Sequence, residues 1–182
     1  VTIATTGDAI DFGDSTITNT WRGGFSNSVR GITGGGGPSA VNTIDFITIA
    51  NTGDAADFGD LTQARRGVGA MASSTRGVFA GGLVPPNNTN IIDYVVISSS
   101  GGGNDFGDLT YARRTFANGS SSNNTIGIFG AGYISANQNS VDFINIMTTG
   151  DASDFGDLVD PKERDQAYVK KVDDAFNRLY RG

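Results

Sequence analysis

Asp57-Phe58-Gly59-Asp60-Leu61 is the stretch from which the architecture of this chain can be worked out, because it recurs. The same five residues stand at 105–109 and 154–158, and 11–14 carry Asp-Phe-Gly-Asp followed by a serine. Successive copies lie 46, 48 and 49 residues apart. A period of roughly 40 to 50 residues is typical of β-propellers and other repeat arrays. We expect the phenylalanine of each copy to fill the core, at Phe12, Phe58, Phe106 and Phe155.

The composition indicates an all-β protein. The 182 residues include 27 Gly and 18 Asp but a single Glu, and β-branched residues are abundant, which favours strands joined by tight turns. The net charge of −6 argues against nucleic acid as a partner. No apolar run reaches the roughly 18 residues of a membrane span. Without cysteine, the chain has no disulfides and no thiol chemistry.

The repeats divide the chain into a β domain and a tail. The β domain covers 1–158, with a half unit at 1–14 and full units at 15–60, 61–108 and 109–157. The second unit predicts strands over 64–72, 76–82 and 91–97, a loop over 84–90, and a last strand opening at Asp105-Phe106. Four short strands in about 48 residues are one propeller blade.

The start of the chain matches the middle of a strand in the later units. Residues 1–9 align with 47–55, so the first copy, with its strand at 1–5, lacks the front of that strand. We therefore expect a fragment, a processed product or a part of something longer. A propeller must close its ring to protect strand edges. Either another copy or a further N-terminal part of the same polypeptide would complete it.

The tail, 159–182, predicts one amphipathic helix near 161–180. Asp160 and Pro161 form a typical helix start, and one apolar stripe comes after them at helical spacing: Tyr168, Val172, Phe176 and Leu179. The stripe packs either on the chain's own repeats or, as an assembly contact, on another subunit. Trp21, in the most divergent unit, offers a similar choice between a contact with a neighbour and a buried core position.

Charged residues recur in register with the repeat, as structural residues do. Asp60 and Asp108 precede Arg65 and Arg113 by five residues, which predicts Asp–Arg pairing within or between blades, and Asp157 is the third aspartate of this kind. A calcium site in the Gly-Asp loops at 53–54 or 150–151 is the alternative. The predicted core joins Phe58, Phe106 and Phe155 to further apolar residues: Val78, Phe79, Ile97, Ile128 and Ile146.

The residue inventory argues against catalysis. With neither His nor Cys, the usual nucleophilic triads and His-based metal sites are absent. Asp-Phe-Gly also occurs in protein kinases, but here it recurs without the other kinase motifs. We therefore expect no catalytic residue, no cofactor and no metal.

The second unit resembles the kelch repeat in its leading Leu61 and Arg65, its apolar strand closed by Gly81-Gly82, and its Ile92-Asp93-Tyr94. Phe106 stands where kelch repeats have tryptophan, and the third unit has Gly130-Ala131-Gly132 in place of the glycine pair. The resemblance implies kelch-like β-propeller blades.

The longer phrase, Ile-Asp-Phe-Ile-x-Ile-x-x-Thr-Gly-Asp-Ala-x-Asp-Phe-Gly-Asp-Leu, resembles a tandem repeat of predicted virion structural proteins of marine tailed phages, cyanophages above all. It covers 1–158. The resemblance implies a non-enzymatic structural or interaction protein of the particle (a tail, fibre or surface component), made in the host cytoplasm. Its partners would be other virion proteins, further copies of itself, or a host surface glycan or receptor. The alternative is a carbohydrate-binding or carbohydrate-active surface propeller.

Overall fold

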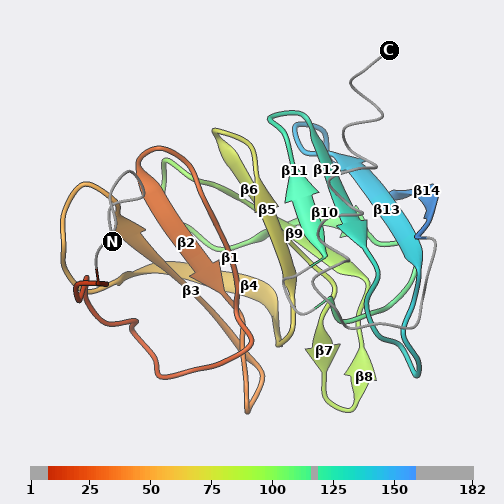
Figure 1. Ribbon diagram of the computed structural model, residues 1–182, viewed down its shortest axis with the longest axis horizontal. Coiled ribbons are helices and arrows are strands. Elements are labelled where there is room, and N and C mark those ends of the chain that lie inside the picture. The colour runs from red at the N-terminus through yellow and green to blue at the C-terminus, as the bar shows by residue number, and fades with distance from the viewer. Residues whose placement is uncertain (1–7, 116–118, 159–182) are drawn as a thin grey trace.

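The computed structural model describes residues 8–115 and 119–158, and this part of the chain is all-β. It contains three four-stranded antiparallel sheets and one two-stranded hairpin, and no helix occurs in these two ranges (Figure 1). Accordingly, no helix in the described ranges is long and apolar enough to cross a membrane. The strand predicted at 1–5 and the helix predicted near 161–180 lie outside the described residues.

Sheet 1 is a simple meander in the order β1-β2-β3-β4. Its strands are β1 (Gly23–Ser26), β2 (Arg30–Gly34), β3 (Val41–Thr48) and β4 (Ala56–Arg65). The second copy of the repeated stretch forms the front of β4, where Gly59 pairs with Ile44 and Asp60 with Thr43. The register shifts between Ile44 and Asp45, so a bulge marks the centre of this pairing.

Sheet 2 repeats the meander with β5 (Gly69–Ala72), β6 (Arg76–Ala80), β9 (Ile91–Val96) and β10 (Asn104–Asp108). The prediction of one strand over 64–72 is wrong in its first half, because Arg65 still belongs to β4 and β5 begins only at Gly69. The predicted loop 84–90 holds part of a hairpin, β7 (Leu83–Val84) and β8 (Asn87–Asn88), which projects below sheet 2 in Figure 1.

Sheet 3 contains β11 (Ser120–Ser122), β12 (Ile126–Gly130), β13 (Ser140–Asn145) and β14 (Ser153–Asp157) in sequential order. Figure 1 shows the three sheets arranged one after another in chain order. The first strand of sheet 2, β5, contacts both β1 and β11. The repeats of the sequence therefore correspond to sheets that stack on their neighbours.

Apolar residues fill the two interfaces between the sheets. The first interface contains Phe58, Phe79 and Ile97, and the second contains Val78, Phe106 and Ile146. All six side chains are buried, as is Ile128 of β12, which confirms the core predicted for these positions. Phe58, Phe106 and Phe155 each also meet an aromatic ring of their own sheet edge to face, as Phe106 does with Tyr94.

One prediction about a single aromatic residue is wrong, and for a second residue one of two alternatives is excluded. The repeat predicts Phe155 in the core, but 36% of its surface is exposed, because no sheet of the described residues packs on the far face of sheet 3 as sheet 3 packs on sheet 2. A core position for Trp21 is also excluded, since this side chain is 54% exposed. Its ring lies against the Arg66 guanidinium, 5.1 Å away. Phe12 is half-buried.

Candidate functional site

The polar side chains with the most elaborate contacts lie where one sheet joins the next. Arg65, at the end of β4, extends into sheet 2 and meets Asp93 of β9, with an N–O distance of 3.0 Å. Both side chains are completely buried. The guanidinium also donates to the carbonyl oxygens of Ile91 and Phe79. A buried charge is tolerated only when it is paired and hydrogen-bonded, and these contacts meet that requirement at both terminal nitrogens, although the buried Nε of Arg65 has no hydrogen-bond partner among the described residues.

The same arrangement recurs at the junction between sheets 2 and 3. Arg113 lies 3.0 Å from Asp142 of β13, again with both side chains fully buried. It donates to the carbonyl oxygens of Phe129 and Ser140 and to the Ser140 hydroxyl. At each of the two junctions a threonine completes the carboxylate's shell. Thr110 donates its amide and hydroxyl to Asp142 at 3.0 and 2.6 Å, and Thr62 does so to Asp93 at the same distances.

Sheet 1 has an equivalent salt bridge, although its residues do not follow the spacing of the other repeats. Arg22 forms a salt bridge with Asp45 of β3 and donates to the Thr33 and Thr43 carbonyl oxygens. Thr16 donates its hydroxyl to the same carboxylate. The first unit thus retains the junction although its threonine and arginine are six residues apart and not three.

Burial and hydrogen bonding act in opposite directions on the pKa values at these junctions. Burial alone would raise the pKa of the Asp45 carboxyl, but hydrogen bonds from Thr16, Arg22 and Ser15 and the charge of Arg22 lower it below its ordinary value. Burial lowers the pKa of Arg65, and the charge of Asp93 opposes that shift. Burial also lowers the pKa of Arg113, opposed by the nearby acidic groups, first of all Asp142.

The structure therefore corrects the predicted Asp–Arg pairs. The arginines do pair with aspartates, within one sequence unit but across from one sheet to the next, and the partners are Asp93 and Asp142. Asp60 and Asp108 are exposed, as is Asp157 of the last copy. The positions of the two aspartates on their strands explain why Arg65 pairs with Asp93. The side chain of Asp60 is exposed to solvent on β4, whereas Asp93 lies in the middle of the apolar strand β9 and faces Arg65.

A second, backbone contact joins each of the first three copies of the repeated stretch to a glycine turn of the next unit. The carbonyl oxygens of Phe12, Phe58 and Phe106 accept from glycine amides in these turns, each at 2.7 Å; the donors are Gly53, Gly101 and Gly150. In two of the turns the next residue completes the contact. Asp54 and Asp151, the residues of the alternative calcium loops, accept the backbone amides of Asp14 and Asp108.

Sequence reasoning missed Arg22 and the three buried aspartates, Asp45, Asp93 and Asp142. A signal was present, because each aspartate interrupts an apolar strand in Ile-Asp-Phe, Ile-Asp-Tyr or Val-Asp-Phe. A carboxylate at a position of this kind needs a buried cationic partner. The fixed step of three residues from Thr62 to Arg65 and from Thr110 to Arg113 points to that partner.

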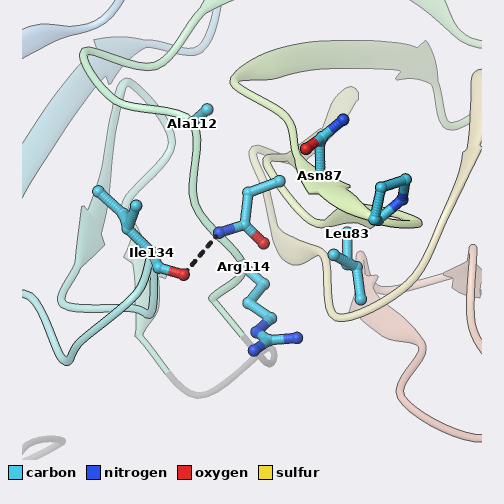
Figure 2. A pocket seen from close by; sticks show the side chains of 7 residues that line it. Leu83, Asn87, Ala112, Arg114 and Ile134 are labelled. Carbon is cyan, nitrogen blue, oxygen red and sulfur yellow. Dashed lines mark hydrogen bonds between the residues drawn. The ribbon is translucent and has the colours of Figure 1, made fainter.

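A shallow pocket lies beside the hairpin β7–β8. It has a volume of about 360 Å³ and is lined by Leu83, Pro86, Asn87, Asn88, Ala112, Arg114 and Ile134. Figure 2 shows Asn87 and Arg114 among the lining residues and the hydrogen bond to Ile134, which the Asn88 amide donates at 3.2 Å. The Arg114 guanidinium stacks on the Tyr133 ring at 4.5 Å. The pocket therefore combines amide and guanidinium groups with small apolar surfaces.

Residues 8–115 and 119–158 contain no group of three or more acidic, His or Cys side chains placed to hold a metal ion. Comparison with models of known protein families gives no match. No significant match to a curated protein sequence is found either.

Proposed function

We propose that this chain is a non-enzymatic structural and interaction protein of a phage particle, built from kelch-like propeller blades. The observation that carries the proposal is the junction made three times over, with Arg22, Arg65 and Arg113 each held by an aspartate of the sheet that it enters. Two of these pairs hold one sheet to the next, and the third holds the segment before β1 to sheet 1. A rigid stack of this kind suits a protein that presents its edge loops to other proteins.

The assignment to a particle rests on the recurring Ile-Asp-Phe…Asp-Phe-Gly-Asp-Leu phrase and its resemblance to phage virion repeats. The experiment is quantitative mass spectrometry of particles of the encoding virus, purified on a density gradient and washed in high salt. The proposal predicts this chain at a fixed ratio to the major capsid protein. Its presence in the infected-cell lysate and loss from washed particles would contradict it.

One observation favours the second candidate, a carbohydrate-binding protein. The pocket beside β7–β8 offers Asn87 and Arg114 beside the apolar Pro86 and Ile134, a combination suited to hydroxyl groups and a sugar ring. A glycan array probed with the native chain and with Asn87→Ala tests it. Binding should be lost in that variant and kept in Asn51→Ala, an exposed asparagine that does not line the pocket.

A further inference from the structure

The outer face of sheet 3 differs from the corresponding faces of sheets 1 and 2, and the first difference is steric. Gly35 and Gly81, at φ of +66° and +62°, lie against the linker that runs from one sheet to the next. A Cβ there would lie 2.7 Å from the Arg65 carbonyl oxygen and 2.4 Å from that of Arg113. Sheet 3 has Ala131 at this place, at φ of +59°. Its methyl group occupies the space that a further linker would need.

The second difference concerns a side chain that reaches across the interface. Arg30 of β2 stacks on Phe46 at 4.6 Å and donates to the Ile97 carbonyl oxygen of sheet 2. Arg76 of β6 likewise stacks on its own sheet's tyrosine and donates to the Ile146 carbonyl oxygen of sheet 3. The equivalent residue of β12 is Ile126, which has no donor to offer.

The third difference is in the residues after each repeated stretch. Thr62 and Arg65 lie one and four residues after the leucine of that stretch, and the same spacing holds in the next copy. After Leu158 these places are taken by Val159 and Lys162, which lie outside the described residues. Valine lacks the hydroxyl that the buried aspartates accept, and lysine lacks the planar fork of arginine.

The apolar part of the face is nevertheless kept. Ile128, Val141 and Leu158 form a small buried cluster, with Phe143 half-buried beside them. Phe143 and Phe155 meet edge to face at 6.1 Å, as the equivalent pairs do in the other sheets, but Phe155 is 36% exposed. Among the described residues, nothing lies within 4 Å of the Cβ position of Gly156, whereas Gly59 and Gly107 lie against the next turn.

We propose that this face ends the repeat array and binds the apolar stripe of residues 161–180 of the same chain. The proposal replaces the expected ring closure at this face, and it does not depend on the assignment to a phage particle. The face retains an apolar cluster on which an apolar partner can pack. It lacks the arginine and the glycine through which sheets 1 and 2 contact the next sheet, since Ile126 and Ala131 stand in their places. Repeat arrays require an atypical end element that covers the last apolar face.

The position and length of the tail single it out as the occupant. It comes directly after Leu158, which already lies on the face. The sequence places Tyr168, Val172, Phe176 and Leu179 on one side of the predicted helix. A helix of about 20 residues would be roughly 30 Å long, enough to cross a sheet of short strands. Such a helix is marginally stable alone and gains stability from an apolar surface.

Cysteine pairing tests the proposal in the full chain, which has no native cysteine. Phe143→Cys combined with Phe176→Cys joins the face to the stripe. In the matched control, Phe143→Cys is combined with Asn177→Cys, one residue along and on a different side of the predicted helix. After mild oxidation of mixed isotope-labelled and unlabelled chains, mass spectrometry separates intrachain from interchain disulfides. The pair Ile126→Cys with Val172→Cys repeats the test at a second position.

We expect intrachain disulfides in both stripe pairs, forming more than about tenfold faster than in the control, because a disulfide requires Cβ atoms about 4 Å apart. Disulfides that form mainly between chains would overturn the proposal in favour of a second copy on this face. Equal rates in stripe and control pairs, or no disulfide in either stripe pair, would also overturn it.

Discussion

Removing Asp93 should destabilise the chain more than removing any other aspartate of the second unit. Its carboxylate is completely buried, 3.0 Å from Arg65, and it also accepts the Thr62 amide and hydroxyl. Asp93→Ala would leave a fully buried guanidinium with only two carbonyl acceptors and no counter-charge. Breaking a buried ion pair in this way costs about 3 to 5 kcal/mol, a large part of the roughly 5 to 15 kcal/mol typical of a domain.

Urea unfolding followed by tryptophan fluorescence measures this loss. With a slope of about 2 kcal/mol per molar, the midpoint should fall by roughly 2 M. The matched control is Asp60→Ala, which removes an exposed carboxylate and should change the free energy of unfolding by about 0.5 kcal/mol or less. Arg65→Met in the Asp93→Ala background removes the unpaired charge and should recover at least about 1 kcal/mol.

The reasoning would be refuted if Asp93→Ala and Asp60→Ala shifted the midpoint equally. It would also be refuted if Arg65→Met added its full cost to that of Asp93→Ala, since the buried pair would then not act as a unit.

Three further predictions concern positions where the repeats differ. Phe106→Ala should lower the free energy of unfolding by about 3 to 5 kcal/mol and Phe155→Ala by only about 1 to 2, because the Phe155 ring is partly exposed. A larger fall of the urea midpoint for Phe155→Ala would contradict the assignment of Phe106 to the core. Gly59→Ala should lower the free energy of unfolding by about 1 to 3 kcal/mol more than Gly156→Ala. Both glycines have positive φ, but only at Gly59 would a Cβ collide with the next turn, 2.7 Å from the Gly101 carbonyl carbon. Equal decreases in melting temperature would show that the turn moves aside. Because the folded-state pKa of Asp45 is lowered, its contribution to stability is complete above the ordinary value of 3.8 and is lost as the pH falls through the folded value; Asp45→Asn should therefore flatten the loss of stability in acid, and an unchanged pH profile would disprove the shift.

The period of the sequence was enough to predict the sheets. Phe58 and Phe106 are buried at equivalent places because residues at one phase of a repeat occupy one place in each unit. Phe155 breaks the rule for a physical reason: burial at this place depends on a further sheet packed against it, and the five repeated residues do not encode whether such a sheet is present.

The junctions were harder to predict because they join residues of different strands that lie far apart in the sequence. Arg65 and Asp93 lie 28 positions apart, and Asp60 was the nearer candidate along the chain. Nearness in the sequence was a poor guide to the partner of Arg65. The last strand of sheet 1 ends with this arginine, which lies against the third strand of sheet 2 along the chain. Asp93, isolated between apolar neighbours, was the more informative residue.

The most direct test of the central claim, that buried Arg–Asp pairs join successive sheets, is nitrogen-15 NMR of the arginine side chains. We predict that the Arg65 and Arg113 guanidinium groups give separate signals that exchange slowly with solvent, each assigned by its Arg→Lys variant. Asp93→Asn should shift only the Arg65 signals, and Asp142→Asn only those of Arg113. Fast exchange at both arginines, or a response of Arg65 to Asp142→Asn, would contradict the claim.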